Sequence, residues 1–297
     1  MPFELVTLQH RKRVSAYWAE VRGLSSENAL RGLANLLSQT QTQRVPPRLL
    51  VALCGSNNRN SRYRSFPMKK KSGGERIIDV PEPSLRWIQR SLLHVFSLIV
   101  QPHKCAHGFV PERSIISHAE IHVNRRWLFV TDIKEFFPSI HWGRVFAMLQ
   151  QTPFNASADM ARIIANLATY NGHLPQGAPT SPFLANSICW RMDHKLYRWA
   201  QGQRCRYSRY ADDLAFSTDR AVFGQMDWQQ LEDIVRSEGF EINEAKRRLV
   251  SRGFRQVLTG LVVNGRRPDV PREVGKNLRA LLHNVIAHGW ESQLHRG

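Results

Sequence analysis

The chain has 297 residues, of which 42% are hydrophobic, so it is long enough for a sizeable core and one to two domains. Lys and Arg total 42 against 24 Asp and Glu, and the net charge of +18 favours a polyanionic partner, most commonly nucleic acid. The four cysteines lack zinc-ligand spacing, no apolar run is long enough to span a membrane, and the N-terminus lacks an apolar signal segment. We therefore expect a cytoplasmic protein with reduced thiols and no membrane partner. Composition alone leaves a ribosomal-type or purely RNA-binding protein open.

The first hundred residues predict helices interrupted by one hairpin. Apolar residues at helical spacing predict helices over residues 1 to about 50, punctuated by Pro46-Pro47. Residues 62–80 alternate apolar and polar positions on both sides of a basic, glycine-containing turn, which is typical of a β-hairpin with a cationic tip. Residues 84–100 carry an apolar stripe and predict an amphipathic helix.

The remaining chain alternates strands and helices. Trp127 to Thr131 predicts a buried strand that ends at Asp132, and Arg206 to Ser217 reads as strand, turn and strand. The other expected elements are a helix at about 157–169, a helix within 182–199, a helix over 228–239, a strand from Val257 to Asn264 and a last helix from about Arg272 to His288. The last helix has six apolar residues on one stripe, and we expect this stripe to pack on the protein body.

Two adjacent carboxylates, Asp212 and Asp213, lie in an otherwise apolar hairpin. Like charges that lose hydration need a compensating cation, and Mg²⁺ prefers such oxygen ligands. An ordinary acidic β-turn is the alternative for this tetrapeptide taken alone. Asp132 ends a separate apolar strand, where the alternative is a helix cap or strand-end turn. Carboxylates from separate strands that meet in one cleft are what a two-metal polymerase needs to hold ions at the attacking hydroxyl and the triphosphate.

The segment from Leu174 to Pro182 is a Pro/Gly-rich turn that opens a helix. Its small residues allow a base pair to approach the backbone closely, and Gln176 is a candidate contact for an incoming nucleotide. The alternative is an ordinary loop followed by a helix cap.

Five strings in this order resemble the motifs of reverse transcriptases. VTDIKEFFPSI resembles motif A, LPQGAPTSP motif B and YADD motif C, while Phe240 to Lys246 resembles motif D and Leu258 to Asn264 motif E. The resemblance covers roughly residues 60–265. It implies an α/β (α+β) right-hand polymerase fold. We expect an N-terminal helical region at 1–60, fingers and palm at 61–265 and a short thumb helix at 266–297.

The resemblance also implies roles for single residues. Asp132, Asp212 and Asp213, with Ile133 beside them, match the ligands of two Mg²⁺ ions, for which Mn²⁺ is a possible substitute. Lys246 matches a lysine proposed to protonate pyrophosphate, although a surface lysine is nearly as good a reading. The implied nucleotide contacts are the steric gate Phe137, which excludes a ribose 2′-hydroxyl, then Gln176, and the triphosphate clamp of Arg76 with one of the lysines Lys69, Lys70 and Lys71. The alternatives for these residues are a core phenylalanine and a solvated basic turn.

Further strings resemble retron reverse transcriptases in particular. That family carries an Asn-Ala-x-x-His element before motif A, which Ala119 and His122 match, while His118 stands where Asn is expected. Thr259 and Gly260 match a Val-Thr-Gly element, with Leu258 in place of Val. KKKSGGERIIDVPEP, at the predicted hairpin, also looks retron-like. Ala119, His122, Thr259 and Gly260 are therefore candidate RNA contacts. The cations of the last helix, Arg272, Lys276 and Arg279, are expected to grip RNA phosphates, and the alternative is a packed terminal helix with ordinary solvated charges.

A retron enzyme copies a dedicated structured noncoding RNA, its template and primer partner, into RNA-linked (2′-5′ branched) single-stranded DNA from dNTPs. The resemblance also implies a separate RNase H, an accompanying effector protein and a bacterial role in anti-phage defence. Two alternatives stay open. One is another bacterial reverse transcriptase, of group II intron-like or abortive-infection type. The other is a noncatalytic RNA-binding scaffold, which the intact carboxylates disfavour.

Overall fold

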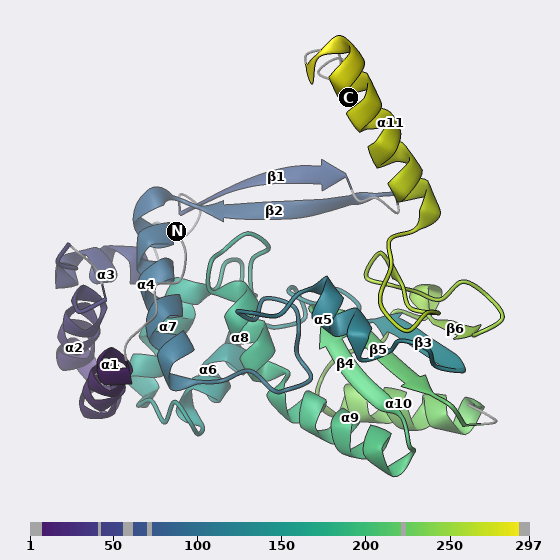
Figure 1. The fold of residues 1–297 in the computed structure, drawn as a ribbon. Helices are drawn as coiled ribbons and strands as arrows, with labels where there is room; N and C mark the ends of the chain where they lie inside the picture. Colours follow the sequence, from purple (N-terminus) through teal and green to yellow (C-terminus); the bar gives the residue numbers. More distant parts are fainter. Residues whose placement is uncertain (1–7, 41–42, 56–61, 70–72, 221–223, 291–297) are drawn as a thin grey trace. The chain divides into compact units, whose positions relative to one another are not determined.

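The computed structural model describes residues 8–40, 43–55, 62–69, 73–220 and 224–290. The chain folds into two compact units that alternate along the sequence (Figure 1). The first unit consists of Met1–His103 and Lys134–Met192, and the second of Lys104–Ile133 and Asp193–Gly297. The expected division at residues 60 and 265 describes functional regions and stays a prediction.

The first unit is mainly helical. Its elements are α1 (Leu8–Val21), α2 (Ser26–Ser38), α3 (Pro47–Cys54), α4 (Pro83–Ile99), α6 (Trp142–Gln150), α7 (Ala158–Ala168), α8 (Ser181–Ile188) and a hairpin of β1 (Tyr63–Lys69) with β2 (Glu75–Pro81). Helix α4 begins where the Glu82 carboxylate accepts the backbone N–H groups of Ser84 and Leu85, which satisfies two orphan donors. The apolar stripe of α4 is buried as predicted, and Phe96 stacks on Phe183. The core of this unit therefore lies around α4.

The second unit is built on a four-stranded sheet in the order β4-β5-β3-β6. Its strands are β3 (Trp127–Asp132), β4 (Arg206–Tyr210), β5 (Asp213–Thr218) and β6 (Arg248–Ser251), and every neighbouring pair is antiparallel. Helices α9 (Trp190–Gly202) and α10 (Gln225–Ser237) cover one face, where Trp199 and Trp228 contact the strand residues Phe216 and Phe129 (Figure 1). The opposite face, with Leu128 and Val130, packs against Ala119 of α5 (Ile115–Glu120) and against Leu258. Alternation along β3 therefore places successive side chains in two separate packing layers.

The expected strand from Val257 to Asn264 is wrong in detail. The segment forms two short strands, β7 (Val257–Leu258) and β8 (Leu261–Val262), which pair with each other. Thr259 and Gly260 form the turn between them, both with positive φ, at 46° and 85°. Positive φ at both central residues is the signature of a two-residue hairpin turn, which the apolar run concealed. Residues 182–199 likewise hold most of two helices, α8 and α9, in place of one.

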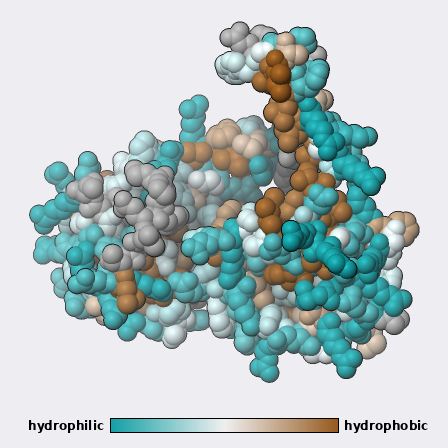
Figure 2. Space-filling view, viewed as in Figure 1, coloured by the Kyte–Doolittle hydropathy of each residue, from teal (hydrophilic) through white to brown (hydrophobic). Residues whose placement is uncertain are grey.

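The last helix, α11 (Arg272–His288), has the predicted bounds, but its apolar stripe does not pack as expected. Figure 2 shows the stripe as a brown band along the helix. Val274, Leu278, Leu281, Leu282 and Ile286 are 45% to 86% exposed. Amphipathic spacing identifies the apolar face of a helix, but it does not supply the element that covers that face. The prediction that this stripe packs on the body is therefore wrong for the described part of the chain.

The four cysteines carry free thiols, as expected. Within the described ranges, none of the helices has the length and apolar character needed to cross a membrane.

Candidate active site

Strand pairing in the second unit brings the three predicted aspartates together. Asp132, the last residue of β3, lies directly opposite Asp213, the first residue of β5. The next residue, Ile133, donates its backbone N–H to the carbonyl of Asp212 at 3.0 Å. Because β3 and β5 are antiparallel neighbours, the end of one strand and the start of the other meet at the same edge of the sheet (Figure 1).

The three carboxylates repel one another in a poorly hydrated place. Asp132 is only 3% exposed, and its Oδ1 atom has no hydrogen-bond partner. Burial, followed by the charges of Asp212 and Asp132, raises the pKa of Asp213 from 3.8 to about 6. Burial is also the main cause that raises the pKa of Asp212, with a further contribution from Asp132. The site therefore favours any cation that can compensate this negative charge.

Lys246 provides one such cation from within the chain. It ends a short 3₁₀ turn, Glu244–Lys246, and its ammonium group forms an ion pair with Oδ2 of Asp132. The turn is held beside β3 because Asn243 donates its backbone N–H to the carbonyl of Asp132 at 2.8 Å. The hydrogen bond to Asp132 is the main cause that raises the pKa of Lys246, so this side chain stays protonated over a wider pH range. The structure thus places Lys246 beside Asp132, while the role in protonating pyrophosphate stays a prediction.

The donor set is suited to Mg²⁺ because it contains only carboxylate oxygens, one of them buried without a partner. Three or more His, Cys, Asp or Glu side chains already grouped as metal ligands are not found among the described residues. The ion pair with Lys246 is one reason why the aspartates are not grouped as metal ligands, because it occupies one carboxylate oxygen of Asp132. The backbone therefore brings the carboxylates together, while their side chains are not arranged as a finished metal site.

The predicted nucleotide contacts that the structure describes all belong to the first unit. Gln176 accepts the backbone N–H of Asp79 in β2 through its own carbonyl at 2.7 Å. A Cβ atom on the next residue, Gly177, would lie only 2.7 Å from the carbonyl oxygen of Asp79. Glycine is therefore needed for this close approach of the two backbones. The motif B turn is therefore fastened to the β1-β2 hairpin, whose strand β2 also carries Arg76.

The other nucleotide candidates lie in exposed or half-buried positions. Arg76 is exposed and contacts the sulfur of Met68, its partner across the hairpin, at 3.2 Å. Lys69 is exposed at the end of β1, whereas Lys70 and Lys71 lie outside the described residues. Phe137 is half-buried, and its ring lies 5.2 Å from the ring of Phe136.

Two of the expected RNA contacts are interior residues. Ala119 and His122 have no exposed surface. The two ring nitrogens of His122 bond to the hydroxyl groups of Ser217 and Ser208, each at 2.8 Å, so the ring links β5 to β4. Burial is the main cause that lowers the pKa of His122, which keeps the ring neutral. The expectation of direct RNA contact is therefore corrected for these two residues, because fully buried side chains offer RNA no surface in this conformation.

The remaining RNA candidates are accessible. Gly260 is exposed and Thr259 half-buried at the tip of the β7-β8 hairpin. Arg272, Lys276 and Arg279 are exposed on α11. Glu273 of the same helix forms an ion pair with Arg255 at 2.7 Å.

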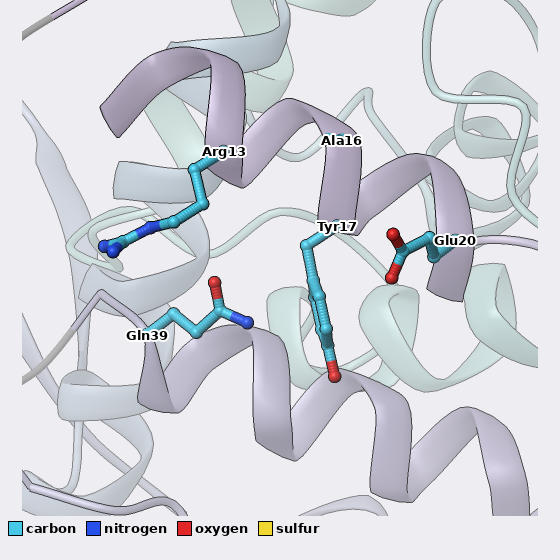
Figure 3. Close-up of a pocket in the computed structure, with 5 residues that line it drawn as sticks. All are labelled: Arg13, Ala16, Tyr17, Glu20 and Gln39. Carbon is cyan, nitrogen blue, oxygen red and sulfur yellow. The ribbon is translucent and has the colours of Figure 1, made fainter. Parts of the chain in front are cut away.

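Sequence reasoning did not single out Arg209 and Asp193, which form a fully buried ion pair of 2.7 Å beside the Asp212 turn. No local signal marks this pair, because β4 has the polar sequence Arg-Tyr-Ser-Arg-Tyr and its burial depends on segments distant in sequence. A shallow pocket between α1 and α2 in the first unit, lined by Arg13, Ala16, Tyr17, Glu20 and Gln39, contains none of the predicted site residues (Figure 3).

Comparison with known proteins decides the family. Residues 68–273 match the family described as reverse transcriptase (RNA-dependent DNA polymerase). The Retron Ec86 reverse transcriptase of Escherichia coli is 30% identical, with 76% of this chain and 70% of that protein covered. The chain belongs to the retron reverse transcriptases. This membership agrees with the α/β class and the right-hand polymerase fold expected from the sequence.

Other similarities are more partial. The Retron Mx162 reverse transcriptase of Myxococcus xanthus is 34% identical over 75% of this chain, but the match covers 52% of that protein. The chain thus spans about half the length of this relative. Among solved structures, a telomerase from Candida albicans in complex with a telomeric RNA fragment has a TM-score of 0.48 at 11% identity, with 68% of this chain and 45% of that chain covered. This structural likeness adds nothing to the family assignment.

Proposed function

We propose that the chain is an RNA-directed DNA polymerase of retron type. The observation that carries this proposal is the meeting of Asp132, Asp212 and Asp213 at one edge of an antiparallel sheet, in a chain of the reverse transcriptase family. Poorly hydrated carboxylates such as Asp212 and Asp213, whose pKa is raised by burial and then by neighbouring negative charge, have no evident structural use, whereas a polymerase requires them.

Asp132, Asp212 and Asp213, with Ile133 beside them, would hold two Mg²⁺ ions, which Mn²⁺ can replace. When bound, these ions lower the pKa of the attacking 3′-hydroxyl and neutralise charge on the triphosphate. Lys246 has an ammonium group that stays protonated, and it lies close enough to Asp132 to act as the proton donor to pyrophosphate. These roles require Asp132 to exchange its ion pair with Lys246 for a contact with a bound cation.

Nucleotide selection is assigned to residues of the first unit. Arg76, with Lys69 or Lys70, would clamp the triphosphate, and Gln176 would contact the incoming nucleotide. The backbone bond between Asp79 and Gln176 supports this assignment because it ties the motif B turn to the hairpin that carries Arg76. Phe137 would lie under the sugar and exclude ribose. Fingers and palm would then occupy 61–265, followed by a thumb helix in 266–297.

The template and primer would be a structured noncoding RNA, and the product a single-stranded DNA joined to it through a 2′-5′ linkage. The net charge of +18 supports a nucleic-acid partner of this kind. A separate RNase H, an effector protein and a role in anti-phage defence in the bacterial cytoplasm complete the proposal, and they rest on membership of the retron family.

The test begins with the full chain purified together with its bound nucleic acid. We expect incorporation of labelled dNTPs that requires Mg²⁺ and stops in EDTA. Asp212→Asn should lower incorporation about a thousandfold or more while RNA binding is retained. Asp219→Asn is the matched control, because Asp219 is an exposed aspartate that pairs with Arg125. Equal incorporation by Asp212→Asn and the wild type would reject the catalytic assignment.

Sequencing of the copurified nucleic acid tests the retron part. A single RNA species joined to DNA through an internal guanosine is the expected result. Diverse RNA without linked DNA, from a preparation that still incorporates dNTPs, would point to another type of bacterial reverse transcriptase. Bound RNA without any incorporation would point to a scaffold.

A further inference from the structure

The turn that carries Asp212 has a backbone conformation that its sequence does not favour. Strand β4 ends at Tyr210 and β5 begins at Asp213, and these two residues pair, so Ala211 and Asp212 form the loop. Ala211 has a φ of 56°, in the left-handed region, and it is 8% exposed. A hairpin loop position with positive φ favours glycine, because at this φ the Cβ atom of any other residue comes too close to neighbouring backbone atoms. Something outside the turn must therefore hold Ala211 in place.

The side chain of Arg209 provides one such contact. Its Nη1 donates to the carbonyl of Ala211 at 2.8 Å. Its Nε and Nη2 donate to the two carboxylate oxygens of Asp193, at 2.9 and 2.7 Å. Arg209 and Asp193 are both fully buried, and Tyr207 donates its hydroxyl to Asp193 at 2.7 Å. Asp193 of helix α9 thus fixes the orientation of the guanidinium group through two of its nitrogens. The third nitrogen, Nη1, holds the carbonyl of the turn residue Ala211.

The backbone on the other side of the turn is equally constrained. Arg209 donates its N–H to the carbonyl of Cys105 at 2.8 Å, and its carbonyl accepts the N–H of His107 at 2.7 Å. The next residue, Gly108, lies so close to Ala211 that a Cβ atom there would clash with the Ala211 nitrogen. The turn is therefore held between the Arg209 guanidinium and the backbone at Gly108.

We propose that Arg209, fixed by Asp193, is a positioning residue that holds the Ala211-Asp212 turn in the conformation required for catalysis. This inference rests on the proposed function. A purely structural ion pair would need only the two bonds between guanidinium and carboxylate, and the third bond, to Ala211, serves the turn. Buried ion pairs are often no more stabilising than apolar residues of similar volume, so stability alone gives little reason for one here.

The main variant is Arg209→Lys, which keeps the charge but cannot hold both Asp193 oxygens and the Ala211 carbonyl. We expect kcat for dNTP incorporation to fall about tenfold or more, while the KM for dNTP and the Kd for RNA change less than about threefold. Mn²⁺ binding by the full chain, measured by electron paramagnetic resonance, should weaken as well. Tyr207→Phe is the matched control, since it removes a buried bond to the same carboxylate without a contact to the turn. Its kcat should stay within about threefold of the wild type.

A rescue experiment separates positioning from general stability. Glycine adopts positive φ without the strain that alanine meets, so Ala211→Gly reduces the need for the Arg209 contact. The double variant Ala211→Gly with Arg209→Lys should recover much of the lost kcat, although the buried ion pair is still altered. The proposal would be overturned if kcat and the melting temperature of Arg209→Lys fell in parallel and the double variant recovered no kcat. A folded Arg209→Lys protein with the kcat of the wild type would also overturn it.

Gly108→Ala supplies an independent test if Arg209→Lys does not fold. The added methyl group would clash with the Ala211 nitrogen and so displace the turn, while Arg209 and Asp193 both keep their side chains. A kcat loss of about tenfold with unchanged RNA binding supports the proposal, and full activity contradicts it. Failure of the proposed function has a different signature, namely a wild type that incorporates no dNTP.

Discussion

Asp132 and Asp213 lie directly opposite each other in the antiparallel pairing of β3 with β5. This register places two carboxylates at one sheet edge, with Asp212 in the adjoining turn. Burial there, followed by the charges of Asp212 and Asp132, raises the pKa of Asp213 to about 6. The arrangement lowers the stability of the metal-free protein at neutral pH, and its consequences can be measured.

The first prediction concerns pH. The folded-state pKa of Asp213, about 6, lies above its ordinary value of 3.8, so the folded state holds the proton more tightly. This contribution to stability is complete below about pH 4 and is lost as the pH rises through about 6. In EDTA at pH 7.5, Asp213→Asn should therefore raise the free energy of unfolding, by on the order of 2 kcal/mol. Thermal unfolding should show a gain of several degrees that shrinks at pH 5. A variant no more stable than the wild type at pH 7.5 would contradict the predicted cost of holding a charged Asp213 in this poorly hydrated, negatively charged place.

The second prediction concerns choice of sugar. Phe137→Val should raise incorporation of rNTP relative to dNTP about tenfold or more, because a smaller side chain leaves room for the 2′-hydroxyl. Phe136→Val is the control, since Phe136 is an adjacent phenylalanine that is 5% exposed. Its substitution should lower the melting temperature and leave the sugar ratio unchanged. An unaltered ratio in an active Phe137→Val protein would assign Phe137 to core packing.

The third prediction concerns the cations of α11. Neutralisation of Arg272, Lys276 and Arg279 to Gln should weaken RNA binding and reduce the slope of log K against log salt by about two, because each phosphate contact releases counterions. The melting temperature should change little, since all three side chains are exposed. A matched triple to Gln uses cations that pair with acids of their own helices, namely Arg31, Arg162 and Arg236. Equal salt slopes for the two triple variants would exclude α11 as the RNA grip.

The fourth prediction concerns the β7-β8 hairpin. Thr259 has a φ of 46°, which is unfavourable for a β-branched residue, and its buried hydroxyl has no partner. Thr259→Asn should stabilise the protein by about 1 kcal/mol, because asparagine tolerates this conformation. If Thr259 contacts RNA, the same variant should bind RNA several-fold more weakly. If RNA binding weakens but the free energy of unfolding is unchanged, the proposed backbone strain at Thr259 is contradicted. If the free energy of unfolding rises but RNA binding is unchanged, Thr259 is not an RNA contact.

The sequence was enough for the elements that depend on local signals. The strand that ends at Asp132, the hairpin around Ala211-Asp212 and the helix from Arg272 to His288 were all predicted, because apolar periodicity and turn residues act over a few neighbouring positions. The motif order also identified the three aspartates before any contact was known. Their positions predict a common site, since each carboxylate stands at a strand end or in a turn.

Only the tertiary structure decided which of these residues have partners. Strand order placed β3 between β5 and β6, which set Asp132 against Asp213, and the return of the chain after α10 brought Lys246 to Asp132. The burial of His122 and the exposure of the α11 stripe were equally hidden, because a side chain's surroundings depend on segments distant in sequence. Arg209 and Asp193 are the clearest case. Each is an ordinary charged residue in the sequence, and only their shared burial makes the pair necessary, since a charge out of water requires an opposite charge beside it.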